Sequence, residues 1–82
     1  MRYAIQHIFL TDNEGKPLSE RKLPSHHLVE AVEVDGAISA LVATQNAAFM
    51  GPIQHFSSSR AQAIALRDRT VFVLDAVAGS DA

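Results

Sequence analysis

Thr70-Val71-Phe72-Val73-Leu74 is apolar on both faces of an extended chain. β-Branched and aromatic residues favour strands, and a strand that is apolar on both faces belongs in the interior of a sheet. This stretch therefore predicts a central strand, and we expect it to be the most buried segment of the chain. Residues 78–82, which follow it, are small or polar, so we expect a disordered tail.

The N-terminal segment predicts a second strand, because its residues alternate with a period of two. One face of residues 2–11 carries Tyr3, Ile5, His7 and Phe9. Residues 12–15 combine Asp, Asn and Gly, which are typical of a tight turn. The sequence therefore predicts a hairpin that returns as a strand over residues 16–23. Because this second strand is polar and begins near Pro17, we expect it at an edge of the sheet.

The middle of the chain is less clear. Residues 28–34 are rich in β-branched side chains and predict a third strand. Asp35-Gly36 then signals a hairpin, which would make residues 37–44 a strand. Against this, Asp35 is a good N-cap and alanine is frequent from residue 37 onward. We therefore expect a helix over residues 36–50, ended by Gly51-Pro52. Its apolar face would carry Ile38, Leu41, Val42 and Phe49.

The segment before the central strand also has two readings. Residues 53–57 predict a loop or a short strand. The serines at positions 57–59 offer an N-cap for a helix that runs to Arg69, and alternating alanines favour that helix. However, Ile64 and Leu66 would point to opposite sides of such a helix, so a strand over residues 61–66 stays open as the alternative.

Together these segments predict an α+β fold, with a small mixed or antiparallel β-sheet and one or two helices on one face. We expect the sheet to include residues 2–11, 16–23, 28–34 and 70–76. The sequence has no internal repeat and no linker. We therefore expect residues 1–82 to form a single domain.

The composition excludes several classes of function. The absence of cysteine excludes disulfides, thiolate catalysis and zinc sites that use sulfur, and it fits a reducing compartment. Seven basic and nine acidic residues give a net charge of −2, whereas nucleic-acid binders carry a basic excess. No apolar run approaches the roughly eighteen residues of a membrane span. We therefore expect a soluble, cytoplasmic protein that binds neither nucleic acid nor membrane.

Four histidines raise the question of a metal site. His26 and His27 are adjacent, and Glu30 lies four residues after His26. On a helix, His26 and Glu30 would share a face and could bind a metal with a third ligand such as His55. On a strand the two adjacent histidines point apart. We expect an exposed polar connection there, with no metal and no cofactor.

Ser57-Ser58-Ser59-Arg60 is the other candidate for chemistry. Free N–H groups at a helix start, hydroxyl groups and one guanidinium together favour an anion such as phosphate or a carboxylate. His55 lies close by in the sequence and could line the same pocket. The candidate ligand-binding residues are therefore His55, Ser57, Ser58, Ser59 and Arg60. Plain N-capping by the serines, with a solvated arginine, is the simpler alternative.

These observations favour a non-catalytic small interaction or accessory domain that acts as a homo-oligomer, most simply a homodimer. Of the 82 residues, 48% are apolar, yet so small a chain buries only about 60% of its unfolded surface. The sequence contains neither a Gly-x-Ser-x-Gly elbow nor a cysteine nucleophile, so no catalytic residue is predicted. The alternative is a protein that binds a small anionic ligand, or a minor enzyme, with a pocket near His55, Ser57–Ser59 and Arg60.

Overall fold

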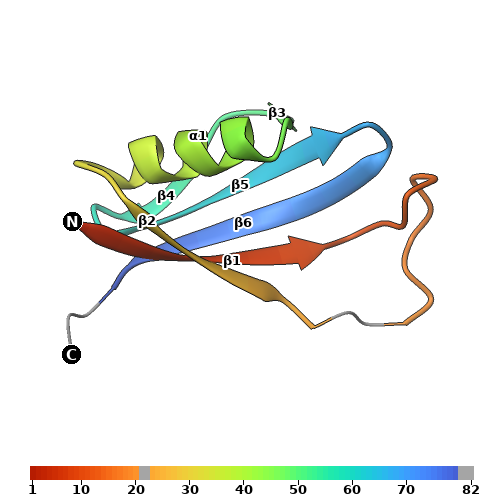
Figure 1. Cartoon of the computed structure of the whole chain (residues 1–82), viewed down its shortest axis with the longest axis horizontal. Helices are drawn as coiled ribbons and strands as arrows, with labels where there is room; N and C mark the ends of the chain where they lie inside the picture. Colours follow the sequence, from red (N-terminus) through yellow and green to blue (C-terminus); the bar gives the residue numbers. More distant parts are fainter. Residues whose placement is uncertain (21–22, 80–82) are drawn as a thin grey trace.

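The computed structural model describes residues 1–20 and 23–79. Within these residues, six strands form one antiparallel sheet and one helix packs on one of its faces (Figure 1). In chain order the elements are β1 (Arg2–Phe9), β2 (Ser25–Glu30), α1 (Val34–Thr44), β3 (Ala48–Phe49), β4 (Gln54–Ser57), β5 (Arg60–Arg67) and β6 (Thr70–Ala78). The predicted α+β class, with an antiparallel sheet and a helix on one face, is confirmed.

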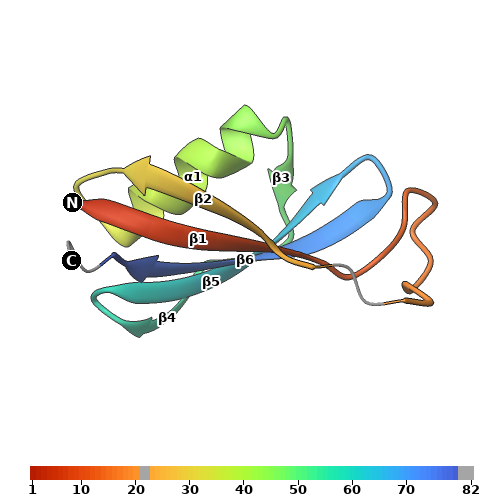
Figure 2. The same ribbon diagram turned by 60° about the horizontal axis from the view of Figure 1, so that its bottom comes forward.

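Strand β6 lies in the middle of the sheet, as its sequence predicts. The strands follow the order β2-β1-β6-β5-β3, and β4 also pairs with β5. Figure 2 shows β6 between β1 and β5. The side chains of Phe72, Leu74 and Ala76 face α1 and are fully buried. Residues 80–82 of the predicted disordered tail lie outside the described residues.

The two ends of the described chain lie side by side. Tyr3 of β1 pairs with Ala78 of β6, and the Gly79 N–H donates a hydrogen bond to the Arg2 carbonyl oxygen at 2.8 Å. Both views show the start of β1 and the end of β6 at the same end of the sheet (Figures 1 and 2). The first and last strands therefore hold each other in place.

The tight turn predicted at residues 12–15 is present. The Asp12 carboxylate accepts hydrogen bonds from the backbone N–H groups of Glu14 and Lys16, at 2.9 and 3.0 Å. Gly15 has a φ of 85°, which side chains other than glycine rarely adopt. A Cβ atom at Gly15 would also lie 3.2 Å from the Arg69 carbonyl oxygen, so this turn packs against the connection between β5 and β6.

The strand predicted over residues 16–23 is wrong. Of its described residues, Pro17 forms only an isolated bridge with Thr11, and residues 21–22 lie outside the described part of the chain. Strand β2 pairs with β1 instead. It overlaps part of the predicted strand 28–34 but begins earlier. Val29 of β2 packs against the core, whereas residues 16–22 are mostly polar. Because loop-closure entropy rises slowly with length, the longer connection costs little.

Helix α1 begins and ends earlier than the predicted helix over residues 36–50. Its N-cap is Glu33, and Asp35 lies in the first turn, where a carboxylate interacts favourably with the helix dipole. The predicted apolar face is otherwise correct, since Ile38, Leu41 and Val42 are buried. Asn46 has a φ of 54° just after the helix. The chain therefore turns there, and Phe49 lies in β3 rather than on the helix.

The helix predicted from the serines to Arg69 is wrong, and the alternative strand is correct. Strand β5 pairs with β6 along its whole length. Its alternate residues Ala61, Ala63 and Ala65 are buried on the face that α1 covers. Small side chains there let the helix lie close to the sheet. Strand pairing and this packing therefore override the helix propensity of alanine.

The core lies entirely between α1 and one face of the sheet. Among the described residues α1 is the only helix, and its 11 residues are too few to cross a membrane, which needs about 20. One helix of this length covers one face of the sheet (Figure 1). The opposite face is left open.

Candidate functional site: the open face of the sheet

The face opposite α1 carries the side chains that alternate with the core positions of β1, β2, β5 and β6. Most of them are apolar, and several are strongly exposed: Leu28 (70%), Ile64 (44%) and Val77 (43%). A surface with several exposed large apolar side chains is typical of an interaction site. We call this surface the open face, and strand pairing places on it Arg2, Ala4, Gln6, Ile8, His26, Leu28, Glu30, Arg60, Gln62, Ile64, Leu66, Val71, Val73, Asp75 and Val77.

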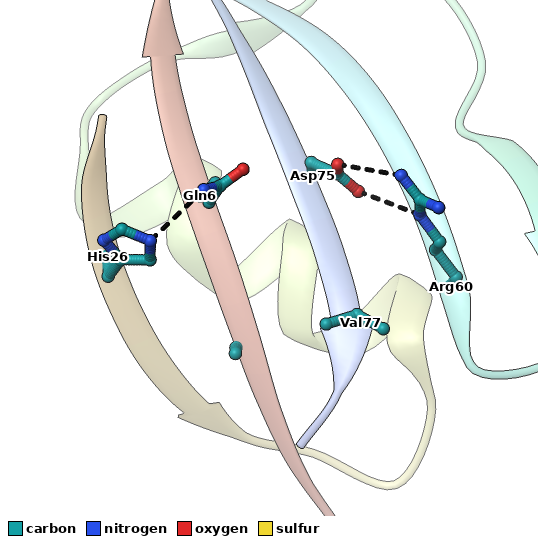
Figure 3. Close-up of a pocket in the computed structure, with 6 residues that line it drawn as sticks. Gln6, His26, Arg60, Asp75 and Val77 are labelled. Atoms are coloured by element: carbon teal, nitrogen blue, oxygen red, sulfur yellow. Dashed lines mark hydrogen bonds and ion pairs between the residues drawn. The ribbon is translucent and has the colours of Figure 1, made fainter. Parts of the chain in front are cut away.

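A row of polar side chains crosses the open face (Figure 3). The strand register places Gln6 between His26 on β2 and Asp75 on β6, and Gln62 of β5 follows Asp75. The Nε2 atoms of Gln6 and His26 are 3.2 Å apart. Because an amide nitrogen can only donate, Gln6 donates this hydrogen bond to the His26 ring.

Arg60 and Asp75 form the charged part of this row (Figure 3). The Arg60 Nη2 and Nε atoms lie 3.2 and 3.5 Å from the two carboxylate oxygens of Asp75. This two-point contact is the geometry in which arginine binds carboxylates best. The Arg60 guanidinium also lies 5.5 Å from the centre of the Phe56 ring, where a cation is attracted to the π face. The positive charge of Arg60 is therefore balanced within the chain.

The open face is uneven rather than deeply cleft. A hollow of about 390 Å³ is lined by Gln6, His26, Arg60 and Asp75 of the polar row, together with Ala4 and Val77. A second hollow, of about 180 Å³, lies farther along β5 and β6, with Met50, Ile64 and Val73 in its walls. Both hollows open on the same surface, so a partner that covers this face would reach into both.

The predicted ligand-binding residues are divided between the two faces of the sheet. His55, Ser58 and Ser59 line one hollow of about 500 Å³ near the start of α1, whereas Arg60 lines the hollow on the open face. The Ser57 hydroxyl accepts a hydrogen bond from the Ser59 N–H at 3.2 Å. This contact belongs to the tight connection between β4 and β5, so no helix begins at these serines.

The hollow that contains His55 has two carboxylates in its walls, together with the N-terminal residue Met1. These carboxylates belong to Glu33 and Asp35, and the Asp35 carboxylate forms a hydrogen bond with the His55 ring. Carboxylates repel an anion, which opposes the binding of phosphate here. The anion site stays a prediction, and titration with phosphate, followed through the amide shifts of residues 57–61, tests it. No movement at millimolar phosphate would exclude the site.

The adjacent histidines point apart, as a strand requires. His26 lies on the open face, and His27 lies on the face that α1 covers. His55 lies on β4, which pairs with β5 rather than with β2. Among residues 1–20 and 23–79, no three His, Asp or Glu side chains are placed to hold a metal ion.

Gln6, His26 and Asp75 are not among the residues that the sequence predicts for a site. Asp75 could have been found, because it is the one charged residue in the run from residue 70 to residue 78. Gln6 and His26 could not, since their proximity depends on the pairing of β1 with β2. The chain matches no protein-family model, no curated protein and no solved structure, so the proposals below rest on its own residues.

Proposed function

We propose that this chain is a non-catalytic interaction module that forms a homodimer through the open faces of two sheets. The observation that carries the proposal is the exposed apolar surface on the side of the sheet that α1 leaves uncovered. Face-to-face packing of two antiparallel sheets about 10 Å apart is a common arrangement in β-sandwiches. A second copy of the chain would supply the cover that each sheet lacks.

The size of the open face suits a stable dimer. Four strands about 4.8 Å apart, each with about eight residues at about 3.3 Å per residue, span roughly 500 Å² in projection. Side-chain relief increases the accessible area, and the exposed Met50 and Phe56 extend it at the β5 edge. Stable complexes bury about 800 Å² on each partner, which is the same range.

The charges of the open face favour a second copy over a charged partner. Arg60 and Asp75 neutralise each other, and Arg2 lies opposite Glu30 where β1 pairs with β2. A surface whose charges cancel gives no net attraction to nucleic acid or to an acidic or basic protein. When two such faces meet, each charge is buried with its partner already beside it, which avoids the large cost of an unpaired buried charge.

Sedimentation equilibrium of the full chain at micromolar concentrations tests this proposal. We expect the wild type to have twice the monomer mass of 8.9 kDa. Ile64→Glu places a charge on the open face in the middle of β5, and we expect it to be folded and monomeric. Val32→Glu is the matched control, because Val32 is 91% exposed outside the open face, and we expect it to remain a dimer.

Two results would contradict the homodimer. One is a wild-type mass that stays at 8.9 kDa up to about 100 μM, a concentration at which standard-size interfaces are normally saturated. The other is an Ile64→Glu variant that is folded by circular dichroism and still dimeric. If Ile64→Glu does not fold, Leu28→Glu provides the same test, because Leu28 lies at the edge of the open face and is 70% exposed.

A further inference from the structure

His7 is the one histidine of the described chain that lies in the core. It is on the face of β1 that α1 covers, with 4% of its surface exposed. The centre of its ring lies 4.2 Å from that of Phe72 and 4.5 Å from that of Phe9. The imidazole is therefore packed between two aromatic rings, in surroundings that solvate a charge poorly.

One nitrogen of this ring has no hydrogen-bond partner. The His7 Nε2 atom is buried and unpartnered among the described residues, and so is the Nε2 atom of His27. The two rings are 6.0 Å apart, centre to centre. Buried polar atoms normally have hydrogen-bond partners, so two neighbouring imidazole nitrogens without one call for a physical explanation.

The groups that face His7 would not compensate a positive charge on it. His27 of β2 and Arg67 of β5 are the titratable groups that act on it among the described residues, and both are basic. Arg67 itself contacts a neutral group, because its Nη1 atom donates a hydrogen bond of 3.2 Å to the amide oxygen of Gln45, just after α1. Helix α1 has an acidic residue in its first turn, Asp35, but its carboxylate is hydrogen-bonded to His55. A proton on His7 would therefore meet only basic neighbours.

We propose that His7 is an acid-sensitive switch in the core, where α1 packs on the sheet while the imidazole is neutral and loosens when the ring takes up a proton. Because His7 lies on the face covered by α1, this inference does not depend on the proposed dimer. It predicts that the fold is most stable at neutral pH and loses stability on mild acidification.

The direction of the pH effect follows from linkage. Burial lowers the pKa of His7 below its usual value of 6.5, and the neighbouring charges of His27 and Arg67 lower it further. The unfolded chain therefore takes up a proton at a higher pH than the folded chain does. The stabilisation is complete above about pH 6.5 and decreases as the pH falls. Between the two pKa values, the ratio of folded to unfolded protein falls about tenfold for each pH unit.

Urea unfolding of the full chain at about pH 7.5 and about pH 5.5 tests the switch, because Asp and Glu side chains titrate mostly below this range. We expect the wild type to lose up to about tenfold in folded-to-unfolded ratio over the unit below pH 6.5. His7→Phe keeps a ring between Phe9 and Phe72 without a titrating nitrogen, and we expect it to lose much less. Val32→His adds an imidazole at a position that is 91% exposed and outside the open face, so it is the matched control and should behave like the wild type.

The proposal is overturned if His7→Phe has the same dependence on pH as the wild type. It is also overturned if the His7 ring protons, followed by NMR, titrate at or above about pH 6.5, the usual value for histidine. His7→Gln is the second variant if the phenylalanine does not fit. If neither variant folds, the NMR titration of the wild type decides alone, because only a midpoint clearly below that value supports the switch.

Discussion

Replacing Ala65 by leucine tests whether α1 lies as close to β5 as the buried alanines indicate. In the sheet Ala65 lies opposite Phe72 on β6 and opposite Phe49 on β3, and both Ala65 and Phe72 are 0% exposed. Directly opposed Cβ atoms in a sheet are about 4.5–5.5 Å apart. A leucine side chain between two phenylalanine rings and below α1 must therefore displace one of them.

The expected cost can be set against the stability of the whole fold. Three added carbon atoms in a filled site destabilise a protein by about 1–3 kcal/mol, which exceeds the benefit of burying them. A chain of 82 residues has a stability of about 4–12 kcal/mol, so the variant should still fold but lose a large part of its margin. In urea, with an m value of about 1 kcal/mol/M, the midpoint should fall by about 1–3 M.

Urea unfolding followed by circular dichroism measures this midpoint, with all proteins at one concentration so that any self-association contributes equally. Ile64→Leu is the control, because the adjacent side chain points to the open face and is 44% exposed. We expect its free energy of unfolding to change by less than about 0.5 kcal/mol. An Ala65→Leu midpoint equal to or above that of the wild type would refute the close packing of α1 on β5.

Three further predictions follow from the structure. Phe72→Ala should lower the free energy of unfolding by about 3–5 kcal/mol, because this fully buried ring fills the centre of the core; a loss below about 1 kcal/mol in urea would contradict that. Asp12→Ala removes the acceptor for the N–H groups of Glu14 and Lys16, so it should lower the thermal midpoint by an amount equivalent to about 1 kcal/mol, and Asp12→Asn should recover part of it. The chain should show no submicromolar affinity for a random DNA duplex at about 150 mM salt, measured by fluorescence anisotropy.

The sequence predicts the positions of the strands better than it predicts which strands pair with each other. The two-sided apolar pattern of Thr70–Leu74 correctly predicts the central strand, and the alternation at Tyr3, Ile5 and His7 correctly predicts β1. These signals are local. The pairing of β1 with β2 spans a long connection. The turn at Gly15 is a local signal, so it cannot show which later segment pairs with β1.

Strand β5 shows why composition misleads in the second half of the chain. Alternating alanines have high helix propensity, but here they are the small residues that a helix packs against. The same error affects the candidate site. Reading Ser57–Ser59 as a helix start placed Arg60 beside them, whereas strand alternation turns Arg60 to the open face and toward Asp75. A helix and a strand place different residues on the same face. When a strand is predicted as a helix, the side chains expected to lie together are therefore the wrong ones.

The central position of β6 also determines when the protein can fold during synthesis. The ribosome makes β1, β2, α1 and β5 before β6, yet β1 and β5 pair with β6 and not with each other. Until the nascent chain has released Ala78 from the exit tunnel, the sheet is in two halves with exposed apolar edges. The sheet is therefore completed only once β6 is available, and the dominance of distant pairings places folding in the slower range of small domains, milliseconds to seconds. During that interval the unfinished edges of β1 and β5 are the segments that a chaperone would have to shield.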